Sequence, residues 1–144
     1  KVVVLSGHPG LTSEEEKEAR WNEDLVWIAR LQELPFDKFL EMWYDQPLFG
    51  ALKHHPQFPM LIERKRSLDP QKLIQLLRTF SLAKQERLWH LPHTLFLYGE
   101  EDLKYAALYN AFVASHKIQG ATHAIHIENP GECAKHIRKW ISMG

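Results

Sequence analysis

Residues 94–102 read Thr-Leu-Phe-Leu-Tyr-Gly-Glu-Glu-Asp, and this stretch decides the fold class. An apolar run that ends at a glycine and three acids predicts a buried strand followed by a loop. A similar run opens the chain, where Val-Val-Val-Leu at 2–5 precedes Ser-Gly-His-Pro-Gly at 6–10. Antiparallel strands usually expose every second side chain, so these continuous runs indicate a parallel sheet whose strands are buried on both faces.

Residues from about 12 to 90 are predicted to be almost entirely helical. Ser13 and Glu16 have the spacing of a capping box, and the helix that begins there is expected to end before Pro35. Apolar residues at i, i+4, i+7 and i+8 give this helix one predicted buried face, which consists of Trp21, Leu25, Ile28 and Ala29.

Three shorter helices are expected in the rest of this block. The first carries the apolar pattern Phe36, Phe39, Leu40 and Trp43, and a second, short one is expected between 49 and 67. Asp69 and Pro70 have the residue types of a cap and a first helical position, so a third helix begins there. Its predicted apolar residues are Leu73, Ile74, Leu77 and Phe80.

Strands and helices alternate again after residue 91. A helix with Leu108 and Phe112 follows the strand at 94–98, then a short strand at 116–119 and a loop at 120–128. A final helix begins at 129–130 and presents Cys133, Ile137, Trp140 and Ile141 on one face. This alternation implies right-handed crossovers and an α/β fold whose parallel sheet is covered on both faces.

Composition narrows the possible functions. The chain has 144 residues, 44% of them hydrophobic, which suits one globular domain or part of one. Its 18 basic and 18 acidic residues cancel, so it lacks the basic field that nucleic-acid binding requires. Its apolar runs are far shorter than the ~18 residues that span a bilayer. We therefore expect neither a nucleic-acid partner nor a membrane.

The single cysteine and the first residue add two expectations. Cys133 has no second cysteine to pair with, which favours a reducing compartment and hence the cytoplasm. On the apolar face of the last helix it is most simply a small buried hydrophobe. The chain opens at Lys1 and runs directly into a strand, and three strands make a narrow sheet. We therefore expect further strands upstream of this sequence.

Asp102 and His123 are the candidate catalytic residues. Both follow predicted strands, and the carboxyl ends of parallel strands are where reactive groups gather. A carboxylate that accepts the imidazole Nδ1–H leaves Nε2 free to take a proton. From the residues alone, Asp102 could equally be a helix cap and His123 a loop histidine bonded to backbone. Glu101 is a second acid that could meet His123.

The nine histidines do not predict a metal site. The pairs 54–55 and His123 with His126 could each supply ligands, but a site needs three or four convergent donors and no thiolate partner is available. We expect no metal and no cofactor.

Several further segments carry a family resemblance. They read Ser-Gly-His-Pro-Gly-Leu at 6–11, Glu-Ala-Arg-Trp at 18–21, Trp-Tyr-Asp-Gln-Pro-Leu-Phe at 43–49, Arg-Ser at 66–67, Ser-Leu-Ala at 81–83, Tyr-Gly-Glu-Glu-Asp at 98–102 and 123–130. In this order they resemble the menaquinone-pathway family of the α/β-hydrolase superfamily, the 2-succinyl-6-hydroxy-2,4-cyclohexadiene-1-carboxylate synthases. The resemblance implies the C-terminal part of an α/β-hydrolase fold plus a helical cap. It divides the chain into a core strand and loop at 1–11, the cap at 12–90, and C-terminal core strands and helices at 91–144.

The resemblance also implies an activity. In this family a Ser-His-Asp triad acts in a lyase reaction, in which the serine takes a proton from a carbon acid and pyruvate is eliminated from a cyclohexene polycarboxylate. Asp102 and His123 match the acid and base of the triad. Arg20 and Arg66 match arginines that bind substrate carboxylates, and Trp43 and Tyr44 match an aromatic wall of the site. The elimination requires no cofactor. Without the resemblance, Arg20 would read as a solvated helix residue and Trp43 as a core aromatic.

The sequence departs from the family in one important respect. It contains no Gly-x-Ser-x-Gly pentapeptide, on which the family carries its nucleophile. Ser6 does not replace it, because its flanking residues match the loop that leads into the cap. We therefore expect the serine and the oxyanion hole in an N-terminal portion of the same protein, which would be this chain's partner. Smaller departures are Thr122, where a glycine is usual, and Leu-Asp-Pro at 68–70.

Two alternatives remain open from the sequence. An ester or carbon–carbon bond hydrolase would share the same scaffold and the same acid–base pair. A non-catalytic fragment that binds a partner along the open edge of its first strand would explain the missing serine pentapeptide.

Overall fold

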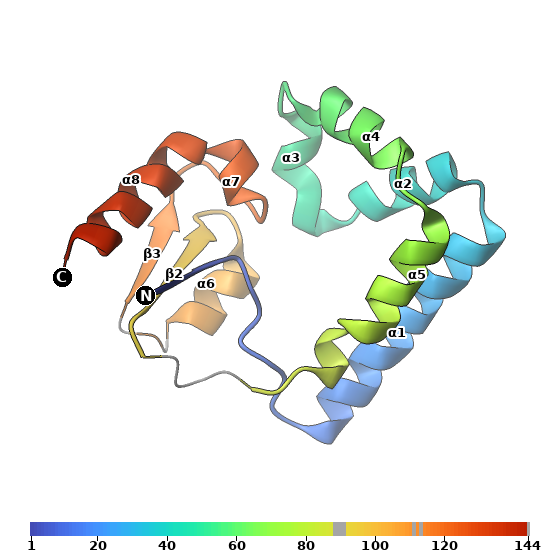
Figure 1. Cartoon of the computed structure of the whole chain (residues 1–144), viewed down its shortest axis with the longest axis horizontal. Coiled ribbons are helices and arrows are strands. Elements are labelled where there is room, and N and C mark those ends of the chain that lie inside the picture. Colours follow the sequence, from blue (N-terminus) through green and yellow to red (C-terminus); the bar gives the residue numbers. More distant parts are fainter. Residues whose placement is uncertain (88–91, 111, 113, 144) are drawn as a thin grey trace. The chain divides into compact units, whose positions relative to one another are not determined.

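The computed structural model of the chain describes residues 1–87, 92–110, 112 and 114–143 (Figure 1). Its sheet consists of strands β1 (Val2–Leu5), β2 (Thr94–Gly99) and β3 (Ser115–Ile118) in the order β1-β2-β3. Both pairings are parallel, with Val3 opposite Leu95 and Leu97 opposite His116. The parallel α/β sheet expected from the apolar runs is therefore confirmed.

The two faces of β2 pack against different helices because successive side chains of a strand point to opposite sides. Leu95 and Leu97 face α7 (Ile125–Glu128) and α8 (Pro130–Ser142), in a cluster with Ile118, Ala121, Ile125 and Cys133. Phe96 faces α6 (Leu103–Tyr109) and packs against Tyr105 and Tyr109. Both clusters exclude water, so the central strand is fixed from both sides, as Figure 1 shows for α6 and α8.

The remaining elements are helical. They are α1 (Glu14–Glu33), α2 (Phe36–Tyr44), the 3-10 turn η1 (Pro47–Phe49), α3 (Gly50–His54), α4 (Phe58–Arg66), α5 (Pro70–Thr79) and the 3-10 turn η2 (Leu82–Lys84). The predicted caps are confirmed: Ser13 and Glu16 form a reciprocal capping box, and the Asp69 side chain accepts a hydrogen bond from the backbone N–H of Gln71.

The chain divides into two compact units. The sheet unit comprises 1–7, 46–58 and 90–144, and the helical unit comprises 8–45 and 59–89. The predicted boundary at 90 and 91 lies outside the described residues. Within the described residues, no helix has both the length and the apolar character that crossing a lipid bilayer requires.

Four expectations about the elements are corrected. β1 is not buried on both faces: Val2 and Leu5 are exposed, because β1 forms the edge of the described sheet. Residues 49–67 contain two α-helices rather than one, and the loop at 120–128 contains α7. The buried face of α1 is formed by Asp24, Ile28 and Leu31, while Leu25 is exposed.

The last turns of two helices also differ from the pattern. Phe80 and Ile141 were expected on apolar faces, yet both are more than half exposed. Phe80 is the cap residue that follows α5, and Ile141 lies in the last turn of α8. Helical periodicity therefore fails at the last turns of these two helices.

Candidate active site

Asp102 lies directly beyond β2 and begins α6. Its Oδ1 accepts a hydrogen bond from the backbone N–H of Tyr105 at 3.2 Å, as a helix cap does. Its side chain is only 5% exposed. A buried carboxylate is tolerated only where its oxygens have partners, and the cap occupies one of them.

His123 occupies the second carboxylate oxygen. Its Nδ1 lies 3.0 Å from Oδ2 of Asp102, so the acid that meets His123 is Asp102 and not Glu101. A carboxylate only accepts hydrogen bonds, so this contact favours Nδ1 as the donor and directs Nε2 away from Asp102. Within the described residues Nε2 makes no hydrogen bond, and the side chain is 22% exposed. The geometry therefore presents a fixed imidazole whose outer nitrogen can accept a proton.

Gly99 makes this approach possible. A Cβ at this position would overlap with the backbone carbonyl oxygens of Ala121 and Thr122, which belong to the loop that carries His123. Only glycine therefore lets this loop lie against the end of β2. Glu128 then holds the loop, because it accepts hydrogen bonds from the backbone N–H and the hydroxyl of Thr122 at 2.6 and 2.7 Å.

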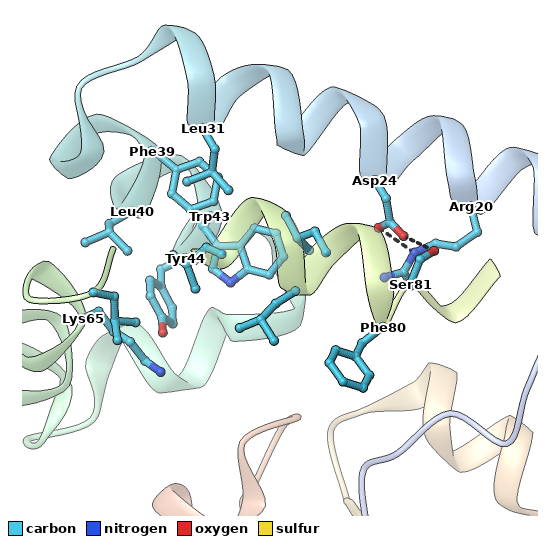
Figure 2. A pocket seen from close by; sticks show the side chains of 14 residues that line it. Arg20, Asp24, Leu31, Phe39, Leu40, Trp43, Tyr44, Lys65, Phe80 and Ser81 are labelled. Carbon is cyan, nitrogen blue, oxygen red and sulfur yellow. Dashed lines mark hydrogen bonds and ion pairs between the residues drawn. The ribbon is translucent and has the colours of Figure 1, made fainter. Parts of the chain in front are cut away.

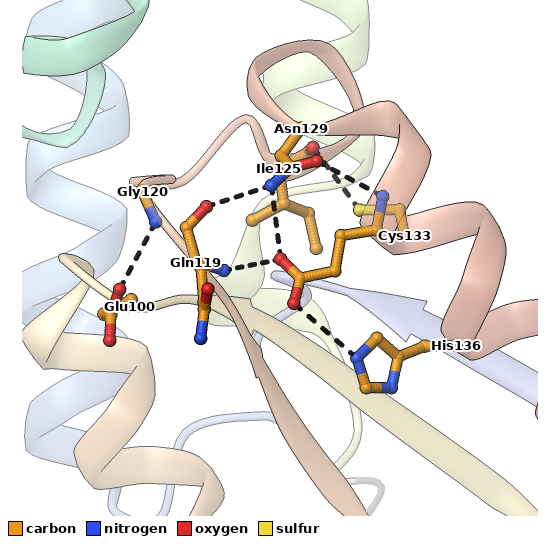
Figure 3. A network of polar contacts seen from close by, with 8 residues as sticks. Glu100, Gln119, Gly120, Ile125, Asn129, Cys133 and His136 are labelled. Atoms are coloured by element: carbon orange, nitrogen blue, oxygen red, sulfur yellow. Dashed lines mark hydrogen bonds and ion pairs between the residues drawn. The ribbon is translucent and has the colours of Figure 1, made fainter.

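The start of the same loop is fixed by a second polar network (Figure 3). The backbone N–H of Gln119 donates to Glu132 at 2.7 Å, and Asn129 Nδ2 donates to the carbonyl of Gln119 at 3.1 Å. The next residue, Gly120, donates its N–H to Glu100 at 3.3 Å. Both ends of the loop are thus tied to secondary structure, which limits the movement of the imidazole.

Two aromatic rings flank the imidazole. The ring of Tyr105 lies 4.8 Å from that of His123 and the ring of Phe49 lies 6.4 Å from it, both measured between centroids. Ser6 shares the sheet unit, at the end of β1, with a left-handed φ of 47°. Its hydroxyl is buried and has no hydrogen-bond partner among the described residues.

Arg20, Trp43 and Tyr44 all belong to the helical unit. They line a pocket of about 340 Å³ between α1, α2 and α5, together with Lys65 and several leucines (Figure 2). Trp43 also packs against Trp27 and Phe39, so it is both a core aromatic and a pocket wall. Burial raises the pKa of the Tyr44 hydroxyl, so it stays protonated and can donate a hydrogen bond.

Arg20 is held inside this pocket by a carboxylate. Its Nε donates to Oδ1 of Asp24 at 2.9 Å, and the hydroxyl of Ser81 donates to Oδ2 of Asp24 at 2.6 Å. Asp24 and Ser81 are both almost fully buried. Figure 2 shows the three side chains converging at one end of the pocket.

Arg66 is placed differently. It is half exposed and pairs with Asp37 at 2.8 Å and Glu63 at 2.9 Å, and it does not line the pocket. Both acids raise its pKa, with the hydrogen bond to Asp37 as the largest cause. The neighbouring Lys65 lines the pocket instead.

Sequence reasoning missed Asp24 and Lys65, and it gave Ser81 and Gly99 no role in the site although both lie in segments that carry the resemblance. Asp24 lies within the apolar face predicted for α1, and a charged side chain is buried only when it has a partner. Its position could therefore have indicated a buried ion pair. Gly99 and Ser81 act through contacts that no local pattern reveals. Among the described residues, no cluster of three or more His, Cys, Asp or Glu is arranged to hold a metal ion.

Comparison with known proteins places this geometry in context. No family model matches the chain. The 2-succinyl-6-hydroxy-2,4-cyclohexadiene-1-carboxylate synthase of Enterobacter sp. (strain 638) is 32% identical over 139 residues, which cover 92% of this chain and 54% of the relative. The enzyme of the same name from Citrobacter koseri is 34% identical over 135 residues, covering 90% and 53%. This chain is homologous to these synthases. It spans about half the length of the curated relatives it matches.

A solved structure supports the homology. The structure of MenH from S. aureus superposes with a TM-score of 0.85 at 25% identity, over 96% of this chain and 57% of that one. The expected resemblance to the synthase family is thereby confirmed, as is the expectation that the chain has part of an α/β-hydrolase fold.

Proposed function

We propose that this chain supplies the acid–base pair and the carboxylate-binding cap of a lyase that eliminates pyruvate from a cyclohexene polycarboxylate in menaquinone biosynthesis. The observation that carries the proposal is the 3.0 Å contact between Asp102 and Nδ1 of His123, with no hydrogen bond to Nε2 from any residue that the structure describes. It stands in a chain homologous to these synthases along about nine-tenths of its length.

The acid–base step follows from this contact. Asp102 holds the Nδ1–H of His123, and Nε2 takes the proton of a serine hydroxyl supplied by residues outside these 144. The serine then removes a proton from a substrate carbon. The electron pair of that C–H bond forms a double bond as the bond to the departing group breaks. The departing group keeps the electrons of the broken bond and takes the proton held on Nε2, so it leaves as pyruvate and the imidazole returns to its neutral form. Asp102 is buried, and each of its two carboxylate oxygens has a hydrogen-bond partner. The carboxylate can therefore stabilise the imidazolium that forms without changing its own position.

The charged and aromatic residues of the helical unit recognise the substrate in this proposal. Arg20 binds one carboxylate through its planar guanidinium, and Trp43 and Tyr44 line the ring-binding surface. Arg66 binds a second carboxylate by exchanging its ion pairs with Asp37 and Glu63, which are exposed and hence weak. The cap at 12–90 and the location in the cytoplasm belong to the same proposal.

The test is pyruvate release by the purified protein, after the intact mass of every polypeptide in the sample has been determined. We expect turnover where a Gly-x-Ser-x-Gly peptide accompanies this chain, and loss of turnover in His123→Ala. Turnover that is unchanged in both Arg20→Ala and Arg66→Ala would contradict polycarboxylate recognition and favour an ester or carbon–carbon bond hydrolase. A lone chain of 16.9 kDa without turnover would favour the non-catalytic alternative.

A further inference from the structure

We infer that Asp24 and Ser81 are positioning residues that aim the guanidinium of Arg20 at a carboxylate in the helical-unit pocket. The inference deepens the proposed function and rests on it, since there Arg20 binds a carboxylate of the substrate. No part of it depends on the acid–base pair.

The first observation is the burial of Asp24. Its side chain is 3% exposed, yet it lies on α1 with a cation that is 35% exposed. Burying a carboxylate costs several kcal/mol before its partners compensate, so stability alone gives little reason to place it there. The order of the two residues along α1 points the same way, because a basic residue four positions before an acidic one is the less favourable order for helix stability.

The second observation is how the carboxylate is held. Ser81 begins η2, and its oxygen accepts the backbone N–H of Ala83 at 3.1 Å. That bond orients the hydroxyl, whose proton points to Oδ2 of Asp24 at 2.6 Å. A residue 57 positions further along the chain thus fixes the carboxylate, leaving Oδ1 for Arg20.

The third observation is which atom of Arg20 is bound. Asp24 takes only Nε, at 2.9 Å, and the two Nη groups make no hydrogen bond to other described residues. The edge formed by the two Nη groups is one of the two guanidinium edges that can bind a carboxylate through two parallel hydrogen bonds. Arg20 lines a pocket that is mostly aromatic and aliphatic and that also contains the cation Lys65, so a carboxylate there would meet two positive charges beside apolar surface. Holding the guanidinium through Nε therefore lowers the entropy lost when a carboxylate binds.

Succinate serves as the probe, because it presents free carboxylates without requiring turnover. Affinity is measured by titration calorimetry in the whole protein for Asp24→Asn and Ser81→Ala, with Glu14→Gln as the control. Glu14 forms an exposed ion pair with Lys17 on the same helix. We expect Asp24→Asn to weaken succinate binding about tenfold and Ser81→Ala less, with Glu14→Gln unchanged.

A double-mutant cycle separates positioning from general damage. If Asp24 acts through Arg20, Asp24→Asn causes no further loss in an Arg20→Ala background. An undiminished loss there would overturn the inference. Wild-type succinate affinity in Arg20→Ala would instead contradict the carboxylate role that the proposed function gives Arg20.

Hydrogen exchange of the Arg20 Nε–H, followed by ¹⁵N NMR, tests the positioning without any ligand. We expect a protected proton in the wild-type protein and in Glu14→Gln, and clearly faster exchange in Ser81→Ala. Exchange unchanged by Ser81→Ala would show that Ser81 does not hold the pair.

Discussion

The sheet unit and the helical unit each contain a buried aspartate whose partner is a more exposed nitrogen-containing side chain. Asp102 is 5% exposed beside His123 at 22%, and Asp24 is 3% exposed beside Arg20 at 35%. In both pairs a second donor occupies the other carboxylate oxygen: the backbone N–H of Tyr105 in one and a serine hydroxyl in the other. The chain therefore contains the same arrangement twice: a buried carboxylate with one hydrogen-bond partner on each oxygen.

The two pairs differ in the side chain that the aspartate holds, which is an imidazole in the sheet unit and a guanidinium in the helical unit. Imidazole gains and loses a proton near neutral pH, whereas guanidinium stays charged. In the proposed function, the buried carboxylate of the sheet unit therefore holds a proton acceptor, and that of the helical unit holds a permanent cation that binds anions. One arrangement suits chemistry and the other suits recognition, so substitutions in the two units are expected to affect different kinetic constants.

The largest expected effect is on turnover in the sheet unit. Asp102→Asn removes the charge that stabilises the imidazolium, so we expect kcat for pyruvate release to fall about 10² to 10⁴-fold with little change in KM. Steady-state kinetics measures this, with the exposed neighbour substitution Glu101→Gln as the control. A loss confined to KM would place Asp102 in binding and remove the contrast between the two units.

A backbone change in the sheet unit is expected next. Gly99→Ala puts a Cβ into the carbonyls of Ala121 and Thr122, so the free energy of unfolding should fall by about 2 to 3 kcal/mol. Urea denaturation measures it. Gly131→Ala is the matched control, since a Cβ there meets nothing within 4 Å and lies in a helix, where alanine is favoured. Equal stability of Gly99→Ala and wild type would mean that the loop does not depend on this close approach.

The helical unit is expected to give a smaller effect of another kind. Arg20→Lys keeps the charge but loses the planar fork, so we expect KM to rise about tenfold while kcat stays close to that of the wild type. Arg64→Lys, on the exposed surface of α4, serves as the control. A fall in kcat with unchanged KM would assign Arg20 to chemistry instead.

The smallest effect depends on pH and again concerns the sheet unit. Burial lowers the pKa of His136 below the ordinary imidazole value, and His116, whose ring lies 4.9 Å away, lowers it further. Glu132 opposes this, while Lys135 and Lys139 add to it. The unfolded chain then binds the proton more readily, so folding stability is complete above the ordinary value of about 6.5 and declines as pH falls below it. Thermal melts between about pH 5 and 8 should show this decline, and His136→Gln should reduce it.

Local sequence patterns predicted the frame of the sheet unit well. Continuous apolar runs identify β1 and β2. The sequence left Asp102 open as a helix cap or as the acid that meets His123, and the structure gives it both contacts through different oxygens of one carboxylate. Its meeting with His123 follows from the rule that the carboxyl ends of parallel strands share one edge.

Sequence patterns failed where a side chain is placed by a partner far along the chain. Periodicity put Leu25 on the buried face of α1, whereas Asp24 is buried because Ser81 and Arg20 satisfy it. The environment of Arg66 likewise depends on Asp37, which is 29 residues away. Such pairings are properties of the tertiary structure, and only the family resemblance singled out Arg20 and Arg66 at all.

The proposed chemistry requires that Asp102 hold His123 as the Nδ1–H tautomer with Nε2 free to accept a proton. ¹⁵N NMR of the His123 ring tests this requirement, with the pH raised until the ring signals no longer change and the signal identified by its loss in His123→Gln. We predict a protonated Nδ1, an unprotonated Nε2, and a changed tautomer ratio in Asp102→Asn. A ring protonated mainly at Nε2, or one indifferent to Asp102→Asn, would contradict the account.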